Sequence, residues 1–398
     1  MLELSLATPK GAHFLRIVEC TGFTNDEISI YDELAQIIEE IGPQQIVAVV
    51  IAGLSTFDGI RSLLAETYPH IYTLPCTSHA LGLALQRVGE LAPFKAAIHA
   101  ERELIGLFNG NALDCSLAED SPLSQMKPGG TRVDGDYISC ARLLACKSAA
   151  REAVLSPEWA QRAQESAAPD IFEIVKLLAL NEKFWAIVRL FCRLVKPMVH
   201  LMRLAESNMP SIGKVYPMCL QIDRHIKRIG LNQDLLASTL GIFREQWNLL
   251  HTPLHAAAYV LEPQFKSAAL GRGVQSQLGQ VLQKMAPDEH LTALAGFSRY
   301  VNSEGVFSNA ELMQLTEDGH KCRIPTYQFW DLEGYEVPVL AGIAQKVTAV
   351  ACSAGSRQAQ SSQNRLSPGR SRELLYVQRN THLIESMRAP KKAAQLTG

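Results

Sequence analysis

Residues 46–52 read Ile-Val-Ala-Val-Val-Ile-Ala, seven apolar residues without a polar interruption. A short run of this kind, rich in β-branched residues, is typical of a strand that is covered on both faces. Gly42-Pro43 precedes it and ends a stretch in which Ile30, Leu34, Ile37, Ile38 and Ile41 recur at helical spacing. The sequence therefore predicts a helix that leads into a buried strand.

Strand and helix patterns alternate on both sides of this run. Leu2, Leu4 and Leu6 alternate with polar residues, and residues 13–20 follow the turn at residues 8–11, which predicts a β-hairpin. After the run come a helical pattern at 57–68, a short strand at 70–75 and a helix at 78–91. This order predicts an α/β fold with a mixed sheet that begins antiparallel.

From about residue 93 onward the pattern is helical. Residues 181–204 place large apolar side chains on overlapping helical faces, and Pro197 is expected to kink or break this run. We predict three segments along the chain: 1–92 as the first part of the α/β core, 93–325 as an all-helical insertion, and 326–398 as the second part of the core.

Composition sets limits on the function. The 38 Lys and Arg nearly balance the 40 Asp and Glu, so any nucleic-acid contact must come from local patches. The nine cysteines are scattered, which favours reduced thiols in an intracellular protein over a disulfide framework. Charged residues interrupt the apolar stretches before membrane-spanning length, so we expect neither secretion nor a membrane partner.

Five strings, taken in order, resemble the transposase domain of the hAT superfamily and its C-terminal dimerisation region. They lie at residues 67–85, at Thr131-Arg132 with the helix that ends in LSPEW, and at 196–217, 250–265 and 364–380. The resemblance spans nearly the whole chain. It implies an RNase-H-like mixed sheet, here without the family's first strand, that is interrupted by a large all-helical insertion, and it implies a nuclear protein.

The same resemblance implies that the metal-binding acids are missing. DNA cleavage by this fold needs carboxylates from separate elements to hold two divalent metals. The family's first acid lies on the opening strand, whereas this chain begins at what resembles the second strand; Ala52 stands at the second acid position, and Ser356 corresponds to the third. We therefore expect no catalysis and no Mg²⁺ or Zn²⁺ cofactor.

Two other hypotheses stay open. An active metal-dependent transposase or nuclease could use displaced acids such as Asp58 with Glu333 or Glu336, although Asp58 is expected to cap or solvate the helix that follows Ala52. The chain could also be a decaying gene fragment without a stable product, because a missing first strand leaves an unpaired sheet edge.

Cys76 and His79 form a Cys-x-x-His pair, which is half of a tetrahedral zinc site. No second ligand pair follows nearby in the sequence, so packing and hydrogen bonding at a strand-to-helix junction is the favoured interpretation.

The resemblance and local charge name the residues that could bind partners. Candidate phosphate contacts are Arg132, Arg365, Arg370, Arg372 and Arg379, with a solvated helix face as the alternative. Candidate dimerisation residues are Leu340, Ile343, Val347, Leu374, Leu375 and Val377, with burial in the chain's own core as the alternative. The predicted function is a catalytically inactive protein that dimerises with itself or a related transposase-like protein, binds DNA weakly and has no small-molecule substrate.

Overall fold

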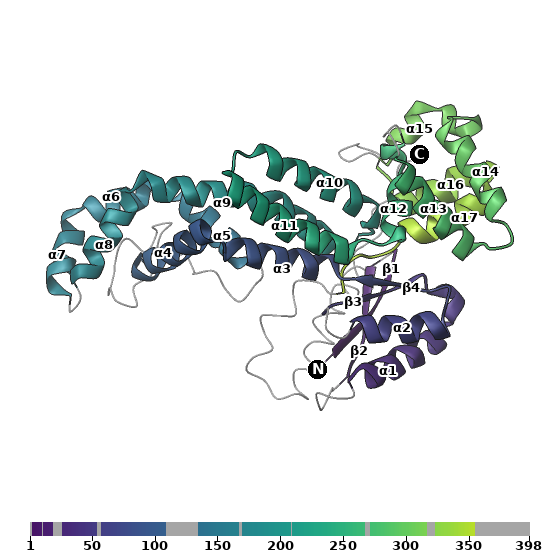
Figure 1. The fold of residues 1–398 in the computed structure, drawn as a ribbon, viewed down its shortest axis with the longest axis horizontal. Helices are drawn as coiled ribbons and strands as arrows, with labels where there is room; N and C mark the ends of the chain where they lie inside the picture. Colours follow the sequence, from purple (N-terminus) through teal and green to yellow (C-terminus); the bar gives the residue numbers. More distant parts are fainter. Residues whose placement is uncertain are drawn as a thin grey trace, which may run out of the picture. The chain divides into compact units, whose positions relative to one another are not determined.

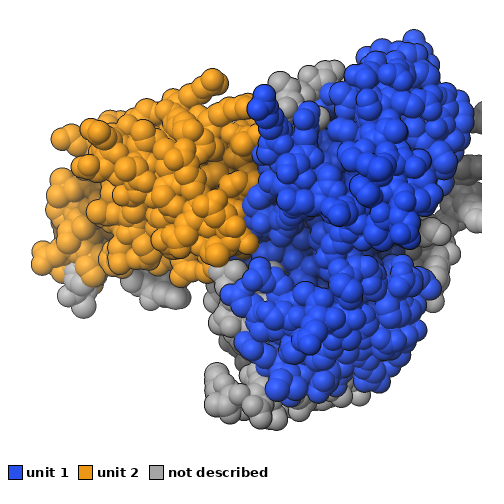
Figure 2. All heavy atoms as spheres, turned by 45° about the vertical axis from the view of Figure 1, so that its right-hand side comes forward, with its two compact units in different colours: residues 1–79, 203–217, 250–398 blue, residues 80–202, 218–249 orange. Residues whose placement is uncertain are grey.

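The structure is a computed structural model, and it describes residues 2–9, 11–18, 26–53, 57–108, 134–166, 169–207, 209–266, 271–316 and 323–354 (Figure 1). Its contacts divide the chain into two compact units. Unit 1 contains residues 1–79, 203–217 and 250–398, and unit 2 contains residues 80–202 and 218–249 (Figure 2).

Unit 1 begins with the predicted hairpin, which is confirmed. Strand β1 (Leu2–Thr8) pairs antiparallel with β2 (Gly11–Val18). The Thr8 hydroxyl donates to the carbonyl oxygen of Gly11 at 2.9 Å, and Gly11 has a φ of 141° that disfavours other residues. The turn chemistry therefore closes the hairpin at the position that the sequence indicates.

The alternating elements that follow are also as predicted. They are α1 (Asp26–Ile41), the short 3₁₀ turn η1 (Pro43–Gln45), β3 (Ala48–Ile51), α2 (Phe57–Thr67), β4 (Tyr72–Pro75) and α3 (Thr77–Gly89). Gly42 has a φ of 98° and a ψ of 115°, an extended conformation with positive φ that favours glycine, and it lies directly after the end of α1. Strand β3 pairs parallel with β4, from Ala48 opposite Tyr72 to Ile51 opposite Pro75.

The sheet differs from the prediction in two ways. Among the described residues, the four strands form two separate two-stranded sheets instead of one mixed sheet. Strand β3 is half-buried along its whole length instead of covered on both faces. The reason is that helices α1 and α2 supply the core on one side, where Ile38, Ile60 and Leu64 pack with Val49 and Ile51.

Unit 1 also contains a group of helices from the second half of the chain. They are α12 (Pro253–Val260), α13 (Arg272–Met285), α14 (His290–Val301), α15 (Ala310–Gln314), α16 (Thr326–Glu333) and α17 (Pro338–Thr348), with the 3₁₀ turns η2 (Pro263–Phe265), η3 (Gly305–Ser308) and η4 (Gly334–Glu336). Trp330 is fully buried at their centre, and its Nε1 donates to the carbonyl oxygen of Leu261 at 2.8 Å.

Contacts of Lys284 in α13 and of Cys352, after α17, join this part of unit 1 to the α/β segment. Lys284 Nζ donates to the carbonyl oxygen of Ile71 at 3.2 Å and lies 4.0 Å from the ring centre of Tyr72. The backbone N–H of Thr77 donates to the carbonyl oxygen of Cys352 at 2.8 Å. Packing therefore divides the predicted insertion at 93–325 between the two units, because part of it belongs with the α/β segment.

Unit 2 is helical throughout its described residues, and the large helical insertion is confirmed. Its helices are the greater part of α3, followed by α4 (Ala92–Phe108), α5 (Gly135–Ala145), α6 (Lys147–Leu155), α7 (Pro157–Glu165), α8 (Pro169–Leu180), and most of α9 (Glu182–Ala205), α10 (Ile212–Arg228) and α11 (Gln233–Leu250). No helix in the described part of the chain is long and apolar enough to cross a membrane.

Pro197 does not break α9, which runs unbroken from Glu182 to Ala205. Proline has no N–H, so the carbonyl of Arg193, four residues earlier, loses its helical partner. His225 of α10 replaces that partner, because its Nε2 lies 2.9 Å from the Arg193 carbonyl oxygen, which can only accept. A side chain from the neighbouring helix thus completes the hydrogen bonding that the proline removes.

Candidate functional site

The carboxyl ends of β3 and β4 meet at one edge of their sheet, where the sequence places its first two site candidates. Ile51 ends β3 and Ala52 follows it, exposed to solvent. Cys76 follows β4, and its backbone N–H donates to the carbonyl oxygen of Ile51 at 2.9 Å. Ala52 and Cys76 therefore lie at adjacent strand ends, as the parallel pairing of β3 with β4 requires.

Thiols and hydroxyls from three distant segments gather beside this edge. Cys76 Sγ hydrogen-bonds with Ser78 Oγ at 3.1 Å and with Ser353 Oγ at 3.5 Å, and it accepts the Ala354 N–H at 3.3 Å. Cys352 Sγ hydrogen-bonds with Ser211 Oγ at 3.1 Å. We call this group the strand-end cluster, and its members are Cys76, Thr77, Ser78, Ser211, Cys352 and Ser353.

The Cys352 thiol of the strand-end cluster is protonated at physiological pH. Burial raises the pKa of the Cys352 thiol to about 11, although the nearby hydroxyls of Ser211 and Thr77 partly oppose this shift. A thiol with so high a pKa is a poor nucleophile at physiological pH. The cluster contains no carboxylate, so it cannot supply the oxygen ligands that Mg²⁺ prefers.

Cys76 and His79 lie at the junction between β4 and α3. Cys76 is buried at the junction between β4 and α3, where the preferred interpretation placed it. His79 is half-buried in the first turns of α3, and this burial lowers the pKa of its imidazole. Cys76 uses its sulfur in hydrogen bonds to the serines of the cluster.

Two of the three displaced acids of the alternative mechanism, Asp58 and Glu336, are paired with arginines. Asp58 is 82% exposed in the first turn of α2, and it pairs with Arg61 at 3.2 Å. Glu336 accepts from Arg299 at 2.5 Å and from the Val306 N–H at 3.1 Å, and Glu333 is half-buried at the end of α16. No three His, Cys, Asp or Glu side chains in the described ranges come together in a way that could hold a metal ion.

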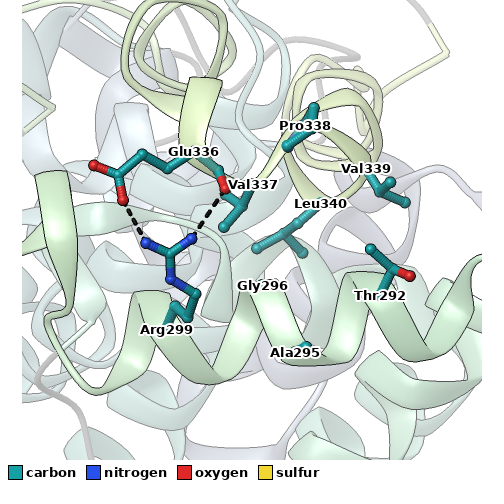
Figure 3. A pocket seen from close by; sticks show the side chains of 9 residues that line it. All are labelled: Thr292, Ala295, Gly296, Arg299, Glu336, Val337, Pro338, Val339 and Leu340. Atoms are coloured by element: carbon teal, nitrogen blue, oxygen red, sulfur yellow. Dashed lines mark hydrogen bonds and ion pairs between the residues drawn. The ribbon is translucent and has the colours of Figure 1, made fainter.

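A groove on unit 1 is the second candidate site (Figure 3). It has a volume of about 180 Å³ and lies between α14, which contributes Thr292, Ala295, Gly296 and Arg299, and residues 336–340 at the start of α17. Arg299 reaches across one end to the carboxylate and the carbonyl of Glu336. A Cβ at Gly296 would lie 3.1 Å from Cβ of Val337, so the absence of a side chain there allows the two helices to approach closely.

The predicted dimerisation residues of α17 face inward. Leu340, Ile343 and Val347 are 1%, 5% and 0% exposed, and α17 packs against α12, α14 and α16. Helical periodicity identified the apolar side of α17 correctly, but it could not tell which other helices cover that side. The apolar residues left on the surface near the groove are Leu291, Leu332 and Tyr335, which are 70%, 61% and 68% exposed.

Several other predicted site residues lie outside the described residues. These are Arg132, Ser356, Arg365, Arg370, Arg372, Arg379, Leu374, Leu375 and Val377. Their roles stay predictions. The sequence reasoning in turn missed Ser211 and Ser353, because single serines in distant segments carry no periodic pattern that would join them to Cys76.

Comparison with known proteins covers only the beginning of the chain. Residues 1–104, about a quarter of its length, match the family described as "Domain of unknown function (DUF659)". This domain is found in hAT-type transposase-like proteins. No curated protein matches the chain. The matched part contains β1 to β4 and three members of the strand-end cluster, Cys76, Thr77 and Ser78. The similarity therefore covers the α/β segment and the start of unit 2.

Proposed function

We propose that this chain is a hAT-transposase-like protein that does not cleave DNA and acts by associating with a second copy and binding nucleic acid in the nucleus. The observation that carries this proposal is the chemistry at the carboxyl end of β3. Ala52 presents a methyl group there, and the neighbouring strand end presents Cys76. Two-metal cleavage requires carboxylates at such positions, and a methyl group cannot bind a metal.

The alternative acids do not compensate for Ala52. Asp58 lies in solvent on α2, where it pairs with Arg61, and Glu336 is paired with Arg299 in the helical part of unit 1. Recruiting them would require breaking these pairs and moving separate elements together. The geometry thus favours a binding role over a nuclease role.

We expect the purified chain not to cleave or join DNA ends in Mg²⁺ or Mn²⁺. The measurement is a strand-cleavage and strand-transfer assay on a labelled duplex, with Asp58→Ala as a variant and Arg61→Ala as its matched surface control. Cleavage by the wild type that is lost in Asp58→Ala and kept in Arg61→Ala would overturn the proposal. Background cleavage that is equal in all three proteins would point to a contaminating nuclease and leave the expectation intact.

The association part of the proposal rests on the surface beside the groove. Leu291 and Tyr335 directly precede the groove residues Thr292 and Glu336, and each is about two-thirds exposed. Exposed large apolar residues next to an apolar groove are typical of an interaction surface. Because the same surface occurs on every copy, a two-fold arrangement could bury both sets at once.

We expect a dimer at micromolar concentration that depends on this surface. The double variant Leu291→Glu/Tyr335→Glu should sediment as a monomer with unchanged helical circular dichroism. Leu177→Glu/Ile174→Glu on α8 is the matched control, because these residues are 62% and 61% exposed in unit 2. A wild-type monomer at 50 µM, roughly fifty times a micromolar dissociation constant, would refute association, and loss of the dimer only in the control would refute this surface.

A further inference from the structure

The outer face of α9 carries a line of basic side chains. Arg189, Arg193, Lys196 and His200 are all exposed, and they recur at intervals of four, three and four residues. This spacing places them on one face of an α-helix. The opposite face holds the buried core residues of α9, such as Trp185, Val188 and Val195. We call Arg189, Arg193, Lys196 and His200 the basic stripe.

The cations of the basic stripe are uncompensated. Neither Arg189, Arg193 nor Lys196 has an ion pair or side-chain hydrogen bond with any residue that the structure describes. The one acid exposed on α9 is Glu182 at its start, and Lys147 and Arg151 bind it at 2.7 and 2.6 Å.

The neighbouring helix α10 carries further exposed cations. His225 of α10 hydrogen-bonds to the Arg193 carbonyl, which fixes the two helices side by side at the middle of the stripe. Arg224 and Arg228, on either side of His225 in sequence, are exposed and likewise lack an acidic partner within the described ranges. Asp223 is already bound by Lys227 and by Arg244 of α11.

Local charge differs sharply from the charge of the whole chain. Residues 182–228 contain nine Lys and Arg but three Asp and Glu, whereas the complete chain has a net charge of −2. A positive surface on a nearly neutral protein is the electrostatic pattern of a site for a polyanion.

The length and composition of the basic stripe favour duplex nucleic acid over a single strand or a lipid bilayer as the polyanion that binds there. From Arg189 to Lys196 the helix rises about 10 Å at 1.5 Å per residue. Phosphates of one DNA strand follow each other at about 3.4 Å along the duplex axis, so this length spans about three of them. The exposed residues of α9 include no Phe, Tyr or Trp on which single-stranded bases could stack and no large apolar side chain that could enter a bilayer.

We infer that the basic stripe of α9, extended by Arg224 and Arg228 of α10, is a binding surface for the phosphate backbone of duplex nucleic acid. It deepens the proposed function, because it names the surface through which a non-cleaving protein would hold DNA. The contacts are to phosphates, so the binding is independent of sequence and strongly dependent on salt.

The test compares the full chain with the variant Arg189→Gln/Arg193→Gln/Lys196→Gln. Binding to a labelled 30-base-pair duplex of mixed sequence is followed by fluorescence anisotropy between about 50 and 200 mM salt, the range over which phosphate contacts change affinity most visibly. Each phosphate contact contributes about 0.9 to the steepness of the plot of log affinity against log salt concentration. Because the variant removes three contacts, the slope of this plot should become shallower by roughly 2 to 3. At about 0.1 M salt this corresponds to a loss of affinity on the order of 100-fold.

The matched control is Arg61→Gln/Arg272→Gln/Lys346→Gln, which removes three exposed cations from unit 1. It should bind as the wild type does. Unchanged melting temperatures would show that all three proteins fold. Equal losses of duplex affinity in the variant and the control would show that affinity depends only on net charge, and would overturn the assignment of the basic stripe as the binding surface.

Other outcomes separate this inference from the proposed function. Wild-type binding that the stripe variant keeps would overturn the stripe but preserve nucleic-acid binding, which would then be assigned to another surface. No duplex binding by the wild type would overturn both, while the cleavage and sizing results would still decide the rest of the proposed function. Stripe-dependent binding to vesicles with 30% phosphatidylserine but not to duplex would assign the surface to membranes and overturn the inference.

Discussion

Replacing Trp330 with alanine is expected to lower the free energy of unfolding of unit 1 by about 3–5 kcal/mol. The indole is fully buried, and its ring centre lies 5.0 Å from that of Tyr300 and 5.7 Å from those of Phe307 and Phe329. Alanine would leave a cavity among these rings, and it would also leave the Leu261 carbonyl without its donor. Denaturant unfolding followed by circular dichroism measures the loss.

The control for this variant is Asp331→Ala, at the next residue of α16. Asp331 is exposed, so its removal should change stability by less than about 0.5 kcal/mol. A loss below about 1 kcal/mol in Trp330→Ala would mean that the helices of unit 1 do not form one core around this residue. Because α16 packs against α17, Trp330→Ala should also weaken the dimer that forms through the surface beside the groove between α14 and α17.

Stability of unit 2 is expected to fall as the pH rises through the range 4.5 to about 7, because of one buried acid. Glu101 of α4 is fully buried, Ser139 of α5 donates to one of its carboxylate oxygens, and the other oxygen has no partner within the described residues. Burial raises the pKa of Glu101 from 4.5 to about 7; the nearby Asp136 adds to the rise, whereas Ser139 and Arg102 oppose it.

The direction of this change follows from the protonation of Glu101 in the folded and the unfolded chain. Below pH 4.5 the Glu101 carboxyl is protonated in both states, so it does not oppose folding. Above about pH 7 the folded protein must bury a carboxylate that the unfolded chain would hold in water. At about 1.4 kcal/mol per pKa unit, this difference destabilises the folded state by roughly 3 kcal/mol.

The variant Glu101→Gln should therefore be more stable than the wild type at pH 8, by about 1–3 kcal/mol once the cost of a buried amide N–H is included. The gain should shrink steadily as the pH is lowered toward 4.5. Urea unfolding at four pH values measures it, with Glu103→Gln, an exposed residue of the same helix, as the control. A gain in Glu101→Gln that does not change with pH would contradict the assignment.

Local patterns predicted the elements well, because the physics that forms them is local. The hairpin at residues 2–18, the helix that Gly42 ends and the strands at residues 48–51 and 72–75 all follow from alternation, periodicity and turn chemistry. The position of Ala52 at a strand end follows from the same local pattern.

Predictions failed where the outcome depends on what covers a surface. The apolar side of α17 was identified, but Leu340 and Val347 lie in the unit's own core because α12, α14 and α16 cover them. Strand β3 was expected to be covered on both faces, yet it remains half-buried. Sequence periodicity defines a face, and only tertiary packing defines its neighbours.

The basic stripe was visible in the sequence and was nevertheless missed. The apolar positions of residues 181–204 correctly predicted a helix with a buried face. The complementary positions 189, 193, 196 and 200 form an equally regular pattern of basic residues. Periodicity alone therefore indicates this surface, whereas the lack of acidic partners among the described residues depends on tertiary packing.

The hydrogen bond from His225 to the Arg193 carbonyl has a consequence for binding entropy. A proline within a long helix ordinarily introduces a bend whose angle can vary. Here the carbonyl that Pro197 releases is held by a neighbouring helix, at the level of the central arginine of the stripe. The backbones that carry Arg193 and Lys196 are therefore already ordered before any partner arrives. A duplex that binds there needs to immobilise only side chains, which lowers the entropic cost of association.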